Sequence, residues 1–220
     1  MTQPWLQSLE LVARPDLLIS SPDRTLIEIA PILDRVAGID LDSGADVRKL
    51  TAAIASGIAD GVDGTRVVIG SESDRVLEQL ERFSVVEVAG TLSPTRITSR
   101  QNPAAVVGLH GFSERAGAPD TSFTMQMIDD WGIEDVMATA LDLASRQGPA
   151  LAVLFDLAVL DPVFEPEGTI PGGLDMRRLL RAARACGGRP DVAAAGFVRA
   201  GSDLNLVYAV LSFCAGLSGR

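Results

Sequence analysis

Residues 154–175 read LFDLAVLDPVFEPEGTIPGGLD, and this stretch decides the fold. An apolar run with strand character ends at Asp156, and Asp161-Pro162 then breaks the regular structure. A loop rich in proline and glycine follows and leads into a segment with a helical pattern. An acid at the end of a buried strand is costly unless another group compensates its charge. Asp156 is therefore the first candidate for a functional residue.

Short strand-like runs alternate with longer helical patterns along the rest of the chain. The predicted strands are 17–20, 66–69, 85–89, 105–109, 122–125, 151–156 and 192–198. The predicted helices are 24–37, 45–59, 74–82, 133–146, 175–186 and 204–217. Nearly continuous apolar strands between helices indicate a mainly parallel sheet covered on both faces, which is a three-layer α/β/α fold. Ligands of such folds bind outside the carboxyl ends of the strands.

Composition limits the kinds of protein that this chain can be. It has 220 residues, of which 47% are hydrophobic and 22% charged, and no low-complexity linker divides it. We therefore expect one α/β domain over residues 1–220. The formal net charge of −10 would repel nucleic acid phosphates and anionic lipids, so neither is expected as a partner.

The cysteines and the apolar runs indicate a cytoplasmic protein. Cys186 and Cys214 are the only cysteines, they lack CxxC spacing, and they fall in two predicted helices. The N-terminal residues do not combine a basic region with an apolar core, so no signal peptide is predicted. No apolar run approaches the roughly 20 residues that cross a bilayer.

The sequence lacks the motifs of several common binding and catalytic sites. Neither GxGxxG nor a Walker A sequence occurs, which argues against nucleotide binding through a known phosphate loop. His110 is the only histidine, and no GxSxG elbow places a nucleophile near it. One histidine cannot form a His-rich metal site, and the strand ends carry few acids, namely Glu72, Asp156 and Glu114.

The opening stretch resembles the ureohydrolase signature of arginases, agmatinases and formimidoylglutamases, which reads SFDxDVLDPxFAPGTGTPxPGGL before a helix. Residues 106–109, 122–125 and 128–137 are similar to the strand, strand and helix start that precede this signature in the family. The resemblance covers about residues 67–217, and residues 1–65 are fewer than the family's usual N-terminal part. It implies an arginase-like fold, shortened at the N-terminus.

The resemblance also implies a reaction and a ligand set. Family members hydrolyse guanidino or amidine C–N bonds with a hydroxide that bridges two manganese ions. The ligands lie in the motifs GGDH, DAHxD and DxD. In this chain the corresponding positions hold six residues, of which Asp156 alone keeps the family's ligand type: Ser73, Ala89, Thr91, Ser93, Asp156 and Ala158. We therefore expect no manganese and a degenerate metal site.

Arg199 follows a different strand at a position where the family has an acid. The positive charge of Arg199 would compensate Asp156, and this predicts an Asp156–Arg199 ion pair in a remnant cleft. His110 and Glu72 are the other polar candidates for that cleft.

Two functions remain open at this point, beside a purely structural domain that retains no function in the cleft. The first is a pseudoenzyme that acts by assembly or by small-ligand binding. Its partners would be copies of itself, a paralogue, or a small cationic ligand attracted by the net charge. The alternative is a hydrolase of linear amidines with an atypical manganese site, or a metal-independent activity that uses Asp156, His110, Glu72 and Arg199.

Overall fold

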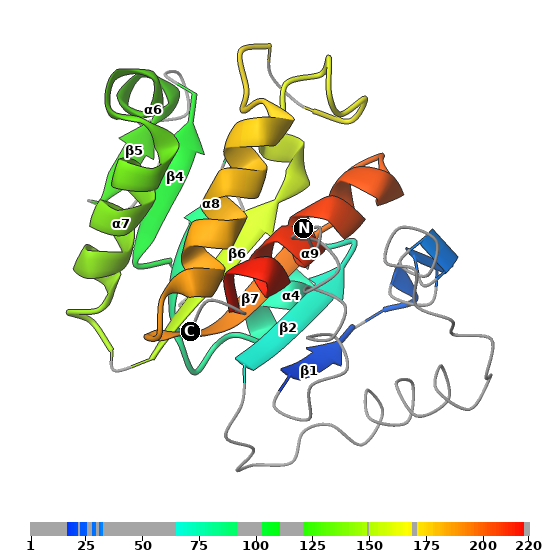
Figure 1. Cartoon of the computed structure of the whole chain (residues 1–220), viewed down its shortest axis with the longest axis horizontal. Helices are drawn as coiled ribbons and strands as arrows, with labels where there is room; N and C mark the ends of the chain where they lie inside the picture. The colour runs from blue at the N-terminus through cyan, green and yellow to red at the C-terminus, as the bar shows by residue number, and fades with distance from the viewer. Residues whose placement is uncertain are drawn as a thin grey trace, which may run out of the picture.

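A seven-stranded sheet forms the middle layer of the molecule (Figure 1). The computed structural model describes residues 17–21, 23–25, 28, 29, 31, 32, 65–91, 103–110, 121–148, 150–168 and 171–217. The strands are β1 (Leu17–Ser20), β2 (Thr65–Gly70), β3 (Ser84–Val88), β4 (Ala105–Leu109), β5 (Ser122–Thr124), β6 (Leu151–Asp156) and β7 (Val192–Val198). All seven predicted strands are confirmed, with bounds that differ by one residue at most.

Every pairing between these strands is parallel, and their order is β1-β2-β7-β6-β3-β4-β5. The chain runs outward from β3 through β4 to β5 and then returns to β6 on the other side of β3. The order of the strands therefore reverses between β3 and β6. In open parallel sheets a crevice forms at such a reversal, outside the carboxyl ends of the strands. Asp156 is the last residue of β6 and lies at this edge.

Helices cover both faces of the sheet. In the described residues they are α4 (Ser73–Glu78), α6 (Met125–Trp131), α7 (Ile133–Ala144), α8 (Met176–Gly188) and α9 (Asp203–Leu217), with a short 3₁₀ turn η2 (Leu157–Val159). In Figure 1, α7, α8 and α9 lie over the face toward the viewer, and α4 is behind the sheet. The predicted three-layer arrangement is confirmed. The predicted helix 45–59 and most of 24–37 lie outside the described residues.

Alternate residues of each central strand enter two different cores. Val67 and Ile69 pack into the core beneath α7, α8 and α9, whereas Val68 packs with α4. Strands that are buried on both faces need apolar residues at nearly every position, which explains their continuous hydrophobic runs. The apolar stripe of α7 packs into the larger core as its periodicity predicts.

The sequence analysis missed α6. It extended a strand to Met125, but β5 ends at Thr124 and a helix begins at once. The Thr124 hydroxyl accepts a hydrogen bond of 3.3 Å from the backbone N–H of Met127. Thr124 therefore caps the N-terminus of α6, a role for which threonine is well suited.

Neither the helices nor the cysteines of the described part indicate a membrane protein or a disulfide. None of the described helices has the length and apolar character to cross a bilayer. Cys186 and Cys214 are free and buried, and burial raises the pKa of each thiol to about 12. Thiols with such a pKa stay protonated and are poor nucleophiles.

Candidate functional site

Asp156 finds hydrogen-bond donors close to its own strand. Its Oδ2 accepts a bond of 2.7 Å from the hydroxyl of Ser73, the first residue of α4. Its Oδ1 accepts a bond of 3.0 Å from the backbone N–H of Ala158, in the turn η2 that Asp156 itself caps. The side chain is only half buried, so two donors and solvent can stabilise its charge.

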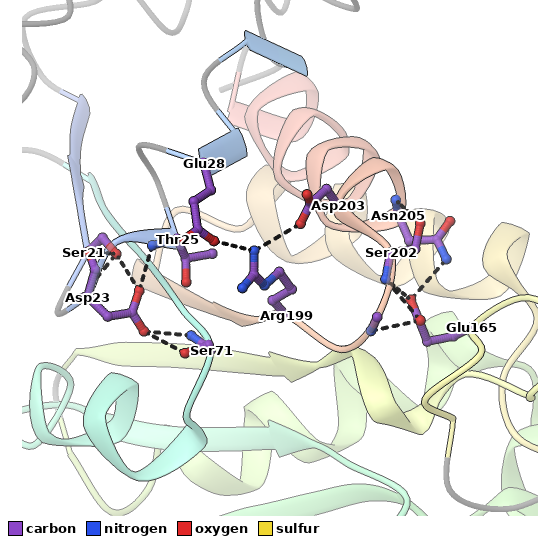
Figure 2. Close-up of polar contacts among 11 residues, drawn as sticks. Ser21, Asp23, Thr25, Glu28, Ser71, Glu165, Arg199, Ser202, Asp203 and Asn205 are labelled. Atoms are coloured by element: carbon purple, nitrogen blue, oxygen red, sulfur yellow. Dashed lines mark hydrogen bonds and ion pairs between the residues drawn. The ribbon is translucent and has the colours of Figure 1, made fainter.

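The predicted Asp156–Arg199 ion pair is wrong. The guanidinium Nη1 of Arg199 lies 2.7 Å from Glu28 Oε2 and 3.2 Å from Asp203 Oδ1 (Figure 2). The hydrogen bond from Arg199 to Glu28 raises the pKa of the guanidinium, and the bond to Asp203 acts in the same direction. Arg199 follows the end of β7, and its side chain extends toward the N-terminal segment and α9. Asp156 therefore depends on Ser73 and Ala158 for its hydrogen bonds.

A second polar contact fixes the N-terminal segment to the end of β2. Asp23 Oδ2 accepts hydrogen bonds from the backbone N–H of Ser71 at 2.8 Å and from its hydroxyl at 2.9 Å (Figure 2). Asp23 Oδ1 accepts a further bond of 2.8 Å from the N–H of Thr25. Burial opposes ionisation of Asp23, but these bonds outweigh it and lower the pKa of the carboxyl well below its ordinary value. Asp23 and Glu28 thus connect the N-terminal segment to the edge where β2 and β7 end.

The other predicted cleft residues lie in different environments. Glu72 is exposed and pairs with Arg75 at 3.0 Å on the outside of α4. His110 follows β4, and its ring lies between Gly90 and Gly172, where an added Cβ would come within 3.9 Å and 3.7 Å of it. Hydrogen bonds from the backbone N–H groups of Val163 and Gly172 lower the pKa of Asp161, and the neighbouring imidazole of His110 acts in the same direction. His110 therefore lies near the loops that follow β3 and β6, and the cleft role expected for Glu72 and His110 stays a prediction.

The remaining positions aligned with metal ligands lie near the carboxyl ends of β3 and β6. Ala89 is buried, Ala158 is half buried and Thr91 is exposed. Ser93 lies outside the described residues. In the part of the chain that the structure describes, no three His, Cys, Asp or Glu side chains come together as a metal-binding group.

Sequence reasoning missed Glu165, which is fully buried. One of its carboxylate oxygens accepts hydrogen bonds from the N–H groups of Gly201 at 2.8 Å and Ser202 at 3.0 Å. The other accepts from Ser202 at 3.1 Å and from the side-chain amide of Asn205 at 3.1 Å (Figure 2). Glu165 therefore joins the loop after β6 to the N-terminus of α9, where backbone N–H groups and the helix dipole favour an anion. No pattern in FEPEG identifies this long-range contact.

A surface cavity of about 470 Å³ lies between α6, α7 and α8. Trp131 and two arginines contribute to its wall, and both arginines already have carboxylate partners. Arg178 pairs with Asp129 at 2.6 Å, and Arg181 pairs with Glu134. The cavity is consequently polar and close to charge balance.

Comparisons with known proteins agree on the fold. The sequence model of the arginase family matches residues 94–200. The formiminoglutamase of Trypanosoma cruzi, in a structure with manganese, has a TM-score of 0.68 at 15% identity, and the match covers 98% of both chains. The arginase of Bacillus subtilis has a TM-score of 0.61 at 14% identity and covers 93% of this chain and 98% of its own.

The formimidoylglutamase of Bacillus subtilis has a TM-score of 0.63 at 15% identity and covers 74% of this chain. This chain spans 64% of the length of that enzyme. No curated protein sequence matches the chain significantly. At such identities the structural matches establish the fold alone.

Proposed function

We propose that the chain, whose residues 94–200 match the sequence model of the arginase family, is a member of that family that has lost the manganese-dependent reaction and acts by binding. The binding role is assembly with a protein partner or capture of a small ligand. The hydrogen bond between Ser73 and Asp156 is the observation that carries this proposal.

That bond joins two positions that the family resemblance assigns to metal ligands. Because Ser73 and Asp156 lie 2.7 Å apart through their side-chain oxygens, the alignment of both motifs to this edge of the sheet has geometric support. A serine hydroxyl is a much weaker manganese ligand than the imidazole of the family motif. In this chain the Ser73 hydroxyl instead donates a hydrogen bond to the Asp156 carboxylate and so occupies one of the two carboxylate oxygens.

The neighbouring positions do not supply replacement ligands. Ala89 and Ala158 have no side-chain donor atom, and the backbone N–H of Ala158 bonds to the second oxygen of Asp156. Two divalent ions need several carboxylate or imidazole ligands that converge on them. Among the residues that the structure describes, those at this edge of the sheet therefore do not fit a manganese pair.

Hydrogen bonds and an ion pair nevertheless hold the segments around this edge of the sheet in place. Asp23 and Glu28 hold the N-terminal segment against Ser71 and Arg199, and Glu165 holds the loop after β6 against α9. A rigid α/β scaffold without its metal chemistry is suited to present a surface. Ureohydrolases commonly form trimers or hexamers, which supports assembly as the retained role, and the charge of −10 would attract a small cation.

Metal analysis combined with an activity assay tests the proposal. The full chain is purified with manganese in every buffer, desalted, and its manganese content is measured by plasma mass spectrometry. Urea release from arginine and agmatine is measured on the same samples, with an active arginase treated identically as the positive control. We expect far less than one manganese per chain and no urea above background. One or more equivalents of manganese with urea release would instead establish the alternative, an amidine hydrolase with an atypical metal site.

A further inference from the structure

Four of the five large apolar side chains that are exposed in the described residues lie in the loop after β6 or on α9. Their exposed fractions are 84% for Val163, 45% for Phe164, 44% for Leu204 and 42% for Tyr208. Trp131, at 53%, is the other exposed large hydrophobic side chain in the described part. Val163 and Phe164 belong to the loop after β6, and Leu204 and Tyr208 lie one turn apart on α9.

Two contacts bring the loop and the helix together. The side-chain amide of Asn205, next to Leu204, donates a hydrogen bond of 2.8 Å to the backbone carbonyl of Phe164. The buried carboxylate of Glu165 accepts from Gly201 and Ser202 just before α9 (Figure 2). These contacts hold the loop that carries Val163 and Phe164 against the start of the helix that carries Leu204 and Tyr208, and we name the four side chains the loop–α9 patch. Grouped apolar exposure of this kind is typical of protein interaction sites.

The surroundings of the loop–α9 patch are acidic. Residues 157–175 and 200–217 contain no Lys, Arg or His, but they include Asp161, Glu167 and Asp203. Glu167 lies beside the start of α9, because its Cγ is 3.1 Å from the position of a Cβ at Gly201. The nearby cation Arg199 is paired with both Glu28 and Asp203. The two segments that carry the patch therefore have excess negative charge.

We propose that the loop–α9 patch binds a protein segment in which apolar side chains are flanked by lysine or arginine. The apolar side chains of the partner would contact Phe164, Leu204 and Tyr208, and its cations would face Glu167 and Asp161. Charge also decides against a second copy of this chain, since a symmetric dimer through the patch would place the acidic segments of one copy against those of the other. The inference gives the partner's chemistry for the binding role proposed above and rests on that role.

A synthetic amphipathic helix of leucine and lysine serves as the probe. Fluorescence anisotropy measures its binding to the full chain and to the variants Phe164→Ser and Leu204→Ser. Trp131→Ser is the matched control, because it removes an equally exposed apolar side chain outside the patch. Two further peptides separate the contribution of charge from that of apolar contact. The first has glutamate in place of lysine, and the second has serine in place of leucine.

We expect each patch variant to weaken binding of the leucine–lysine peptide by about tenfold or more, as truncation of a central apolar contact does. Trp131→Ser should leave the affinity unchanged, and both altered peptides should bind weakly. Glu167→Gln should weaken binding and reduce its dependence on salt. Thermal unfolding confirms that each variant is folded, and Tyr208→Ser replaces any variant that is not.

The inference would be overturned if the patch variants bound the leucine–lysine peptide with the same affinity as Trp131→Ser. It would also be overturned if the peptide with serine in place of leucine bound tightly to the wild type. Sedimentation velocity supplies a second test. A dimer of the wild type that Phe164→Ser abolishes would show that a second copy occupies the patch. These outcomes leave the manganese and urea measurements untouched, so a failure of this inference is distinguishable from a failure of the proposed function.

Discussion

Ser73 donates a hydrogen bond of 2.7 Å to Asp156 across 83 positions of the chain. The two residues come from different strand–helix connections, the one after β2 and the one after β6. The family resemblance assigns both positions to one metal site, and in this chain they contact each other directly. This direct contact between two positions that the resemblance assigns to metal ligands is the central feature of the proposed function.

Ser73→Ala tests how much that contact stabilises the fold. Loss of a hydrogen bond to a charged group should lower the free energy of unfolding by about 1.5–3 kcal/mol, toward the lower end because the carboxylate is half buried. Chemical denaturation measures the change, and a double-mutant cycle with Asp156→Ala isolates the coupling between the two side chains. Ser145→Ala is the control, since the Ser145 hydroxyl bonds to the exposed end of α7. Additive effects of Ser73→Ala and Asp156→Ala would show that the two side chains are not coupled.

Arg199→Gln tests the attachment of the N-terminal segment. This variant removes the cation that bonds to Glu28 and Asp203, so the backbone amides of residues 21–29 should exchange with solvent faster. Hydrogen exchange followed by mass spectrometry gives the rates. Arg189→Gln is the matched control, because Arg189 also bonds to two carboxylates, those of Asp142 and Asp191, but elsewhere in the molecule. Faster exchange of residues 21–29 in both variants would mean that general destabilisation, and not the Glu28 contact, is responsible.

Because the pKa of Asp23 is lowered in the folded protein, we expect the free energy of unfolding to fall at acidic pH. Its folded pKa is lowered by hydrogen bonds from Thr25 and Ser71, so its contribution is complete above the ordinary pKa of 3.8 and declines as the pH falls from there toward the folded pKa. Asp23→Asn should therefore cost more stability at pH 6 than at pH 3. Urea unfolding at the two pH values measures the difference between wild type and variant. A difference that stays constant with pH would contradict a lowered pKa.

Glu165 should contribute more to stability than its neighbour Glu167. Glu165→Ala removes a buried carboxylate that accepts hydrogen bonds from the N–H groups of Gly201 and Ser202, and the loss of these charge-assisted bonds should cost about 1.5–3 kcal/mol. Glu167→Ala alters an exposed carboxylate two residues away and should change stability by about 0.5 kcal/mol or less. Thermal and chemical unfolding of the two variants give the comparison. Equal losses would mean that the bonds to the start of α9 do not stabilise the protein.

Much of the fold could be predicted because periodicity and strand–helix alternation are local signals. The predicted bounds of β6 are correct to the residue. The existence of all seven strands and the parallel character of the sheet were also predicted. The helix α6 was missed because Thr124 is compatible with both a strand and a helix cap, and seven residues give a weak periodic signal. The predicted ligand positions Ser73 and Asp156 could be brought together only through the family resemblance.

The partners of the charged groups could not be predicted, because they depend on side-chain directions at strand ends. Asp156 ends β6 and Arg199 follows the adjacent strand β7, which made an ion pair reasonable, but the guanidinium of Arg199 pairs with Glu28 and Asp203. Glu165 accepts from residues 36 and 37 positions away, a separation at which sequence carries no pairing signal. Long-range hydrogen bonds of this kind follow from the completed fold.

A crystal structure of the protein crystallised with manganese tests most directly the claim that Ser73 and Asp156 bond to each other and hold no metal. Anomalous scattering would locate manganese beside Asp156 if any were bound there. We expect no anomalous peak at this edge of the sheet, and Ser73 Oγ within hydrogen-bond distance of Asp156 Oδ2. Two manganese peaks beside Asp156, with its carboxylate turned away from Ser73 to coordinate them, would contradict the account.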